Sequence, residues 1–468
     1  MSSISIDLAK EILDEVLKRG AKFAIVRLEE RTYERIVYDT GTLREYSYST
    51  LRGAGIRVCI SEGCGYAYTT DISRDAISRA IDKAFAIART RAVLVPFDID
   101  RDKLAKGRFV TVYKVNPFDV DSETKVRIVE RIDRESRGRE GVVSTATMMA
   151  FERDRRIVVS SDGAEAEADI MLVGYGHLAV ARSGDVMERV YDSKSFVGGF
   201  ERINEQEFAK LVEEVDRLAV EASKAKTPSP GVYRAVIDND LVGLLIHEAF
   251  GHASEGDEVV AKASVLEGRI GGTVASELVT VIDDGSIEGG YPVPFDDEGV
   301  VKTRTIVVDR GVLKSYLTSR ATARRLGLEP TGNARAESIL FEPLVRQTNY
   351  FIAPGDWKVD EMLRDMKEGL YLRGRGAMGG QVDPATGTFT FSIGPSYIVK
   401  NGEPVELVRG VTVSGQILEI LRDVDAIGRD LKVETSVFGF CGKGGQHVRV
   451  GDGGPHIRVK RITVGGGT

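Results

Sequence analysis

The chain has 468 residues, of which 42% are hydrophobic and 29% are charged, and its formal net charge is −7. A chain of this length holds roughly two to four domains and buries a sizeable core without disulfides. It has no lysine and arginine run long enough for a phosphate-binding face and no stretch near the ~20 apolar residues of a membrane span, so we expect neither a nucleic-acid nor a membrane partner.

Residues 1–110 carry mixed helix and strand signals. Leu8, Ile12 and Val16 recur at helical spacing and Gly20 follows as a stop, which predicts a first helix. A second helix is expected over residues 76–91. Strand-like segments between them cover residues 23–27, 35–38, 44–50 and 55–60. We predict an N-terminal α+β domain over 1–110.

Residues 111–227 repeat this mixture. A helix is expected over 123–137 and a longer one over 204–226, where Phe208, Leu211 and Val215 form an apolar stripe. Strands are expected at 142–151, 156–160 and 165–178. The proline- and glycine-rich segment 227–231 then breaks the pattern. We therefore predict a central α+β domain over 111–227.

Beyond this break the composition of the chain changes. Glycine becomes frequent and short β-like runs alternate with turn signals, as at residues 278–282, 305–309 and 388–393. This pattern predicts a β-rich antiparallel C-terminal domain over 228–468, which would carry the catalytic site. The fold class expected for the whole chain is α+β, with a mixed α/β N-terminal half.

The strongest chemical signal follows a predicted helix start. Asp238 can cap a helix, and the apolar run 241–246 leads directly into His247 and Glu248. Imidazole is a good zinc ligand, and an adjacent carboxylate can take a proton from a water that zinc activates. A histidine–glutamate pair at the end of a buried helix is therefore a candidate metal site.

The second histidine of this motif has an unusual spacing. His247 and His252 stand at i and i+5, which separates them by about 140° on a regular α-helix. One metal ion cannot reach both across that angle. A π-type turn, or a helix that breaks at Gly251, would bring them together.

Two histidines and a water leave a catalytic zinc one protein ligand short. Residue chemistry favours Cys441 and Glu255 equally for the third position, and Asp257, His447 and His456 are further candidates. The other two cysteines, Cys59 and Cys64, have no neighbouring histidines and are expected to be free thiols. Three cysteines in a long chain, and charged side chains throughout residues 1–20, favour a reducing cytoplasmic location without a signal peptide.

Several segments of the C-terminal half resemble the TldD/PmbA family of metallopeptidases, and its catalytic TldD branch in particular. The H-E-x-x-x-H motif at 247–252 matches the family's signature. Further matches occur in the family's order, namely PFDDEG (294–299), PTGNARAES (330–338), GGQVDP (379–384) and CGKGGQ (441–446). One departure is Gln347, which stands where the family tends to have methionine and which we do not expect at a metal position.

This resemblance implies specific roles. His247 and His252 correspond to the family's histidine ligands, Cys441 to its cysteine ligand and Glu248 to its general base. The implied cofactor is Zn²⁺. The implied reaction is hydrolysis of peptide bonds in unfolded or small peptides by a zinc-activated water.

The resemblance also implies a partner. Family members pair with a related but inactive subunit, called TldE or PmbA, and the two enclose a cavity for unfolded peptides. From this one sequence a homodimer stays open. Two other functions also stay open, namely a non-catalytic binding or regulatory subunit of a peptidase complex and a zinc hydrolase of non-peptide amides.

Overall fold

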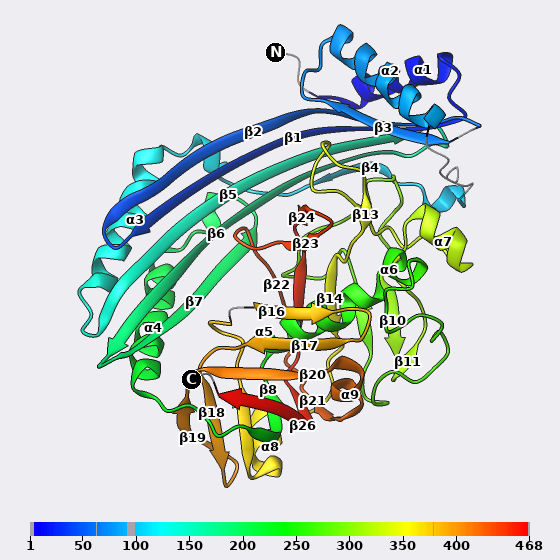
Figure 1. Ribbon diagram of the computed structural model, residues 1–468. Coiled ribbons are helices and arrows are strands. Elements are labelled where there is room, and N and C mark those ends of the chain that lie inside the picture. The colour runs from blue at the N-terminus through cyan, green and yellow to red at the C-terminus, as the bar shows by residue number, and fades with distance from the viewer. Residues whose placement is uncertain (1–3, 62, 91–98, 378, 467–468) are drawn as a thin grey trace.

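The computed structural model describes residues 4–61, 63–90, 99–377 and 379–466. The N-terminal half forms a long curved sheet, and the C-terminal half lies on the concave side of that sheet (Figure 1). Within the described ranges, no helix combines the length and the apolar character that crossing a membrane requires.

The curved sheet is built mainly from long antiparallel strands. They are β1 (Phe23–Asp39), β2 (Thr42–Cys59), β3 (Cys64–Thr69), β4 (Lys106–Val110), β5 (Val142–Ser160), β6 (Glu165–Ser183) and β7 (Val186–Val197). Their order is β3-β2-β1-β5-β6-β4, and β7 also pairs with β6. β4 runs parallel to β6, and the other pairs are antiparallel.

β1, β2, β5 and β6 are longer than the sequence predicted, and β3, β4 and β7 were not predicted. Breaks were expected after residues 27 and 151, where the chain is charged, yet β1 and β5 continue through both places. Arg27 forms an ion pair with Asp297, and Glu152 forms one with Arg449. A buried charge is tolerated inside a strand when it is paired, so these polar runs do not end the strands.

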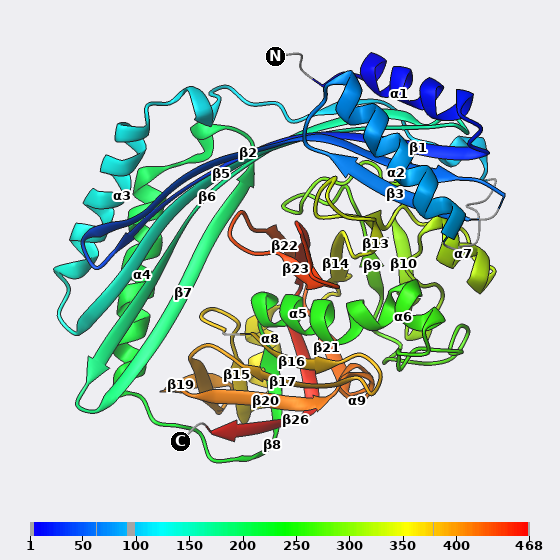
Figure 2. The same ribbon diagram turned by 45° about the horizontal axis from the view of Figure 1, so that its top comes forward.

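Four helices cover the convex face of the sheet. α1 (Ile6–Lys18) and α2 (Arg74–Thr90) pack at one end, and α3 (Ser122–Arg137) and α4 (Glu205–Lys224) pack at the other (Figure 2). All four match predicted helices, with small differences at their ends. Residue 91, where the second helix was expected to end, lies outside the described residues. The apolar stripe of α4 is buried in the core beneath α3 and α4.

The curved sheet takes strands from both predicted N-terminal domains. β1 to β4 come from residues before 111 and β5 to β7 from residues after it, and β1 pairs with β5 along most of its length. The division at residues 110 and 227 stays a prediction.

The C-terminal half contains two larger sheets. One has the order β16-β17-β20-β26-β8-β15-β18-β19 with β21 beside β26, and the other has the order β11-β10-β9-β14-β25-β22. Most pairs are antiparallel, while β8 with β15 and β14 with β25 are parallel. The strands are β8 (Gly231–Ile237), β9 (Val281–Asp283), β10 (Thr305–Asp309), β11 (Val312–Leu313), β12 (Ala334–Arg335), β13 (Leu344–Val345), β14 (Asn349–Ile352), β15 (Gly369–Leu372), β16 (Gly379–Asp383), β17 (Thr388–Ser392), β18 (Ser396–Lys400), β19 (Glu403–Val408), β20 (Val411–Gln416), β21 (Val424–Ile427), β22 (Lys432–Thr435), β23 (Cys441–Lys443), β24 (Gln446–Val448), β25 (Gly451–Gly454) and β26 (Ile457–Gly466).

Short helices connect and cover these sheets. They are α5 (Asn239–Leu245), α6 (Gly256–Val260), α7 (Arg320–Leu326), α8 (Val359–Met366) and α9 (Ile417–Arg422). The largest apolar core of the described residues lies here and includes Leu241, Val242 and Leu245 of α5. α5 is therefore anchored by burial, and this fixes the position of residues 246–251, which follow it directly. The predicted α+β fold class is confirmed.

The prediction for the two N-terminal cysteines was wrong. Cys59 and Cys64 are joined by a disulfide, and they face each other where β2 pairs with β3. The hairpin between them brings two cysteines that are five residues apart into contact, which spacing alone did not indicate. Cys441 remains a free thiol and is buried.

Candidate metal centre

The histidine motif lies in a distorted continuation of α5. The carboxylate of Asp238 caps α5 by accepting a hydrogen bond from the backbone N–H of Leu241, at 3.0 Å. A π-helical turn, Ile246–Gly251, follows directly, and then a short 3₁₀ turn, His252–Ser254. The backbone N–H of His252 donates to the carbonyl of His247, which is the i to i+5 bond of a π-helix. The predicted π-type turn is confirmed, and it places both imidazoles on one side of the helix.

Gly251 contributes space rather than backbone freedom. Its φ of −61° and ψ of −49° are ordinary helical values that any residue adopts. A Cβ at this position would lie only 2.1 Å from Oε1 of Gln347. The side-chain amide of Gln347 packs here because it donates a hydrogen bond to the carbonyl of His247, at 3.1 Å. Gln347 therefore supports the π-turn from outside, although its sequence position suggested no link to the motif.

The third member of the group comes from a distant hairpin. Cys441 begins β23, which pairs with β24. The two strands are joined by Gly444 and Gly445, whose φ values of +58° and +75° favour glycine. The guanidinium of Arg346 donates a hydrogen bond to the carbonyl of Cys441 and holds the hairpin against the rest of the C-terminal half.

The structure brings His247, His252 and Cys441 together. One donor atom from each lies within 4.8 Å of the others. Sγ of Cys441 is 3.4 Å from Nε2 of His252. His247 and Cys441 are buried, and the side chain of His252 is 13% exposed. Residues far apart in the sequence thus form a compact cluster of one thiol and two imidazoles.

The electrostatics of the cluster favour a charged thiolate. Burial acts to raise the pKa of Cys441, but the facing imidazoles of His247 and His252 outweigh it and hold that pKa well below its usual range. Burial likewise acts to lower the pKa of His247, and the thiolate outweighs it and raises the pKa to about 9. A metal cation that binds here would take the place of the protons on these donors.

Glu255 is fully buried and orients His252 from behind. Its Oε2 lies 3.1 Å from Nδ1 of His252 and 2.8 Å from Nζ of Lys443. Burial acts to raise the pKa of Glu255, but His252 and Lys443 outweigh it and lower the pKa to about 2. A carboxylate on the outer nitrogen of a histidine fixes the ring so that its other nitrogen faces the metal. Glu255 thus holds His252 in place and is not a member of the cluster itself.

Replacing Glu255 by glutamine is expected to lower zinc affinity by about 10- to 100-fold, because the charge that orients His252 is lost. Competition with a chromophoric chelator measures this change. Asp257→Asn is the matched control, since Asp257 contacts Lys443 at 2.7 Å and belongs to the same ion network. The control should keep nearly full affinity. Equal losses in both variants would assign the effect to the network around Lys443.

The other candidate histidines lie elsewhere. His447 faces Glu337, with its Nδ1 3.6 Å from the carboxylate, and His456 is bound to Asp430 at 2.6 Å. Neither belongs to the cluster of possible ligands found among the described residues. Each histidine instead has a carboxylate neighbour of its own.

Glu248 stands beside the cluster at the edge of a small cavity. Its side chain is 38% exposed, and its Oε2 lies 3.8 Å from Nε2 of His252. The cavity has a volume of about 180 Å³. Its wall includes His247, Glu248, Cys441, Phe440 and Asp452. A solvent-facing carboxylate next to three potential ligands has access to a water molecule in that space.

The side chains fit a zinc ion. Zinc–sulfur and zinc–nitrogen bonds of about 2.3 and 2.0–2.1 Å at a tetrahedral angle place two such donors about 3.6 Å apart, close to the observed 3.4 Å. Nδ1 of His247 is buried and has no hydrogen-bond partner among the described residues. Imidazole nitrogen and thiolate sulfur are both donors that catalytic zinc sites use.

Comparisons with known proteins place this geometry in context. The three domain models of the PmbA/TldA metallopeptidases match residues 24–88 (domain 1), 115–222 (central domain) and 230–466 (C-terminal domain). A metalloprotease of Methanocaldococcus jannaschii is 36% identical over 96% of this chain and 98% of its own. A zinc metalloprotease TldD homolog of Saccharolobus solfataricus is 29% identical over 96% and 97%.

Solved structures show the same fold. A crystal structure from Thermotoga maritima matches with a TM-score of 0.81 at 22% identity, covering 98% of this chain and 99% of the other. TldE from Thermococcus kodakarensis matches with a TM-score of 0.75 at 16% identity, covering 98% and 100%. Together with the domain models, which cover most of the sequence, these matches lead to one conclusion. The chain belongs to the PmbA/TldA metallopeptidase family.

Proposed function

We propose that this chain is a zinc-dependent peptidase of unfolded or small peptides. In this proposal His247, His252 and Cys441 hold the metal, and Glu248 is the general base. The observation that carries it is the cluster of three donors within 4.8 Å beside a solvent-facing carboxylate. The names of the relatives, which include a zinc metalloprotease, support the same proposed activity.

The residues have distinct tasks in the reaction. Zinc, when bound, supplies Lewis-acid polarisation of the scissile carbonyl and activation of water. Glu248 accepts the proton that water loses and returns it to the leaving amine. Glu255 keeps Nε2 of His252 facing the cluster, and Gln347 supports the turn that aligns both histidines.

Removal of the metal tests the proposal directly. The purified chain should contain zinc and cleave an unfolded peptide, a chelator should abolish cleavage, and added zinc should restore it. Elemental analysis measures the zinc content, and chromatographic separation of the products measures peptide cleavage. A chain that takes up no zinc, or that cleaves equally well after its removal, would contradict the proposal.

A partner subunit is part of the proposal. The fold is shared with TldE, so pairing with a related inactive subunit is reasonable. The alternative, in which this chain is itself the non-catalytic subunit, leaves the cluster and Glu248 without a purpose. Co-purification from the native cell would identify the partner. The cytoplasmic location stays a prediction.

The substrate class has one competitor. A zinc hydrolase of non-peptide amides would use the same residues. Product analysis on matched panels of peptides and small amides separates the two. Cleavage confined to small amides would exclude the peptidase.

A further inference from the structure

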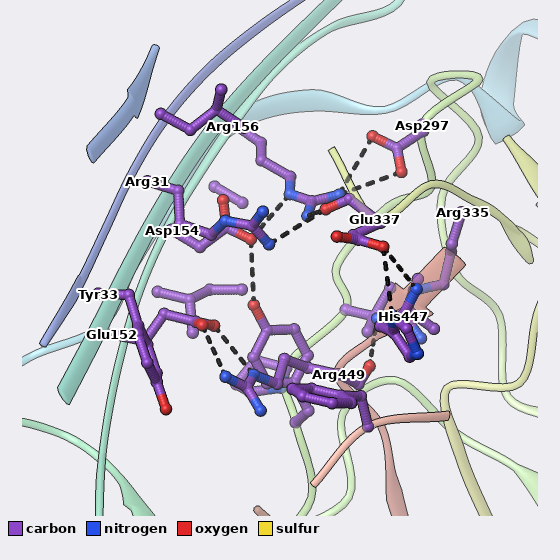
Figure 3. A pocket seen from close by; sticks show the side chains of 18 of the residues that line it. Arg31, Tyr33, Glu152, Asp154, Arg156, Asp297, Arg335, Glu337, His447 and Arg449 are labelled. Carbon is purple, nitrogen blue, oxygen red and sulfur yellow. Dashed lines mark hydrogen bonds and ion pairs between the residues drawn. The ribbon is translucent and has the colours of Figure 1, made fainter. Parts of the chain in front are cut away.

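A larger cavity lies between the curved sheet and the C-terminal half. Its volume is about 410 Å³. Arg31, Tyr33 and Glu152 of the curved sheet form one side, and Arg335 and His447 of the C-terminal half lie on the other (Figure 3). It is thus enclosed by residues that only the folded chain brings together.

This cavity adjoins the metal cluster. Phe440 lines both the larger cavity and the small cavity beside Glu248. Cys441 and Val448 are directly paired across the β23–β24 hairpin, and Val448 lines the larger cavity. One hairpin therefore presents Cys441 to the cluster and its partner strand to the cavity. A peptide that extended from the cluster past Phe440 would enter the larger cavity.

Most arginines around the larger cavity are already paired with carboxylates. Arg449 binds Glu152 through two nitrogens, and Arg156 contacts both Asp154 and Asp297. These pairs leave little net charge for a ligand. The pairs of Arg449 with Glu152 and of Arg156 with Asp297 also hold the curved sheet against the C-terminal half.

Among the arginines that line the cavity, Arg335 is the exception. Its side chain lines the cavity and the residue is 7% exposed, yet its guanidinium forms no ion pair with a carboxylate among the described residues. Its hydrogen-bond acceptors are two backbone carbonyls, those of Gln347 and Arg449. Burial lowers the pKa of Arg335 to about 10. Arg156 and Arg346 act in the same direction, and Tyr291 and Asp297 oppose it. The guanidinium is thus held by neutral carbonyl groups and keeps free N–H donors.

We propose that Arg335 makes this cavity a subsite for a carboxylate of the peptide substrate. A guanidinium offers five N–H donors in a planar fork, of which the two carbonyls leave several free for a bidentate bond. The carboxylate belongs either to an acidic side chain near the scissile bond or to the end of the peptide. This subsite rests on the proposed function for its substrate class.

Binding of matched probes tests the subsite. Fluorescein-labelled octapeptides with a single glutamate at successive positions are compared with the same peptides carrying glutamine. A second pair compares a free C-terminal carboxylate with its amide. Binding is measured by fluorescence anisotropy on the Glu248→Gln background, so that the probe stays intact. One position is expected to bind about tenfold or more tightly as the carboxylate.

Variants of Arg335 assign the preference to this residue. On the same background, Arg335→Gln should bind the carboxylate and amide probes equally, and Arg335→Lys should keep part of the difference. Arg310→Gln removes the same charge from a side chain that is 80% exposed and should leave the preference unchanged. Thermal unfolding shows whether Arg335→Gln folds. If it does not, the comparison of carboxylate and amide probes on the Glu248→Gln protein, in which Arg335 is intact, decides whether the subsite exists.

The outcomes separate this inference from the proposed function. Equal binding of all matched probes, or an equal loss for both members of a pair in Arg335→Gln, overturns the subsite. Cleavage by the wild-type chain without any carboxylate preference overturns the subsite alone. A preference that depends on Arg335 in a chain that cleaves no peptide supports the subsite and overturns the peptidase. The position of the preferred carboxylate in the probe distinguishes an acidic side chain from the C-terminal carboxylate of the peptide.

Discussion

Glu248→Gln is expected to reduce peptide cleavage by about 100- to 10,000-fold while zinc stays bound. The amide has nearly the shape of the carboxylate but cannot accept a proton from water. Glu248 is not one of the three clustered donors and faces the cavity beside them, so its replacement should leave the metal in place. The measurement is kcat/KM on an unfolded peptide together with the zinc content of the same sample.

An exposed carboxylate outside the cavity provides the control for this experiment. Glu277→Gln makes the same chemical change on the surface and should keep full activity. Full activity in zinc-loaded Glu248→Gln would remove Glu248 from the base role. Loss of zinc along with activity would instead show that Glu248 helps to hold the metal.

Cys441→Ser is expected to lower zinc affinity by more than about 100-fold, beyond the effect of losing a residue that merely orients a ligand. The thiolate supplies the negative charge of the cluster, and the pKa of Cys441 is held low by the two imidazoles that share the site. A serine hydroxyl stays neutral and binds zinc poorly. Competition with a chelator gives the affinity, and the peptide assay should show a parallel loss of activity.

The same variant decides between the two ligands that residue chemistry left open. Cys441 points into the cluster, whereas Glu255 contacts Nδ1 on the outer side of His252. Unchanged zinc affinity in Cys441→Ser would exclude the thiolate and return Glu255 to the ligand set. Thermal unfolding of the metal-free protein separates a loss of folding from a loss of binding.

Local signals predicted the helices and the distortion of the histidine motif. The stripe of Phe208, Leu211 and Val215 has the period of a helix, and burial of that stripe needs no knowledge of the partner. The i to i+5 spacing of His247 and His252 excludes a shared face on an α-helix, so it requires another turn if both bind one ion. The π-turn of the structure meets that requirement.

The strands of the curved sheet were less predictable. The charged sequences in the middle of β1 and β5 have the composition of loops. The residues that pair with these charges are distant in the chain, so the local sequence does not indicate that the charges can be buried. Arg27 is paired with Asp297 and Glu152 with Arg449, each from the other half of the chain. Contacts between segments hundreds of residues apart decide whether such residues are buried.

The sequence by itself therefore determined the α+β class, the helices and the two histidines with their neighbouring glutamate, because each depends on neighbours along the chain. Cys441 entered the predicted ligand set through resemblance, and only the tertiary structure placed it 3.4 Å from His252. The tertiary structure also decided the contacts of Glu255 and Gln347 with the histidine motif and the position of Arg335 in its cavity. These features depend on distances between side chains that only the packing of separate elements sets.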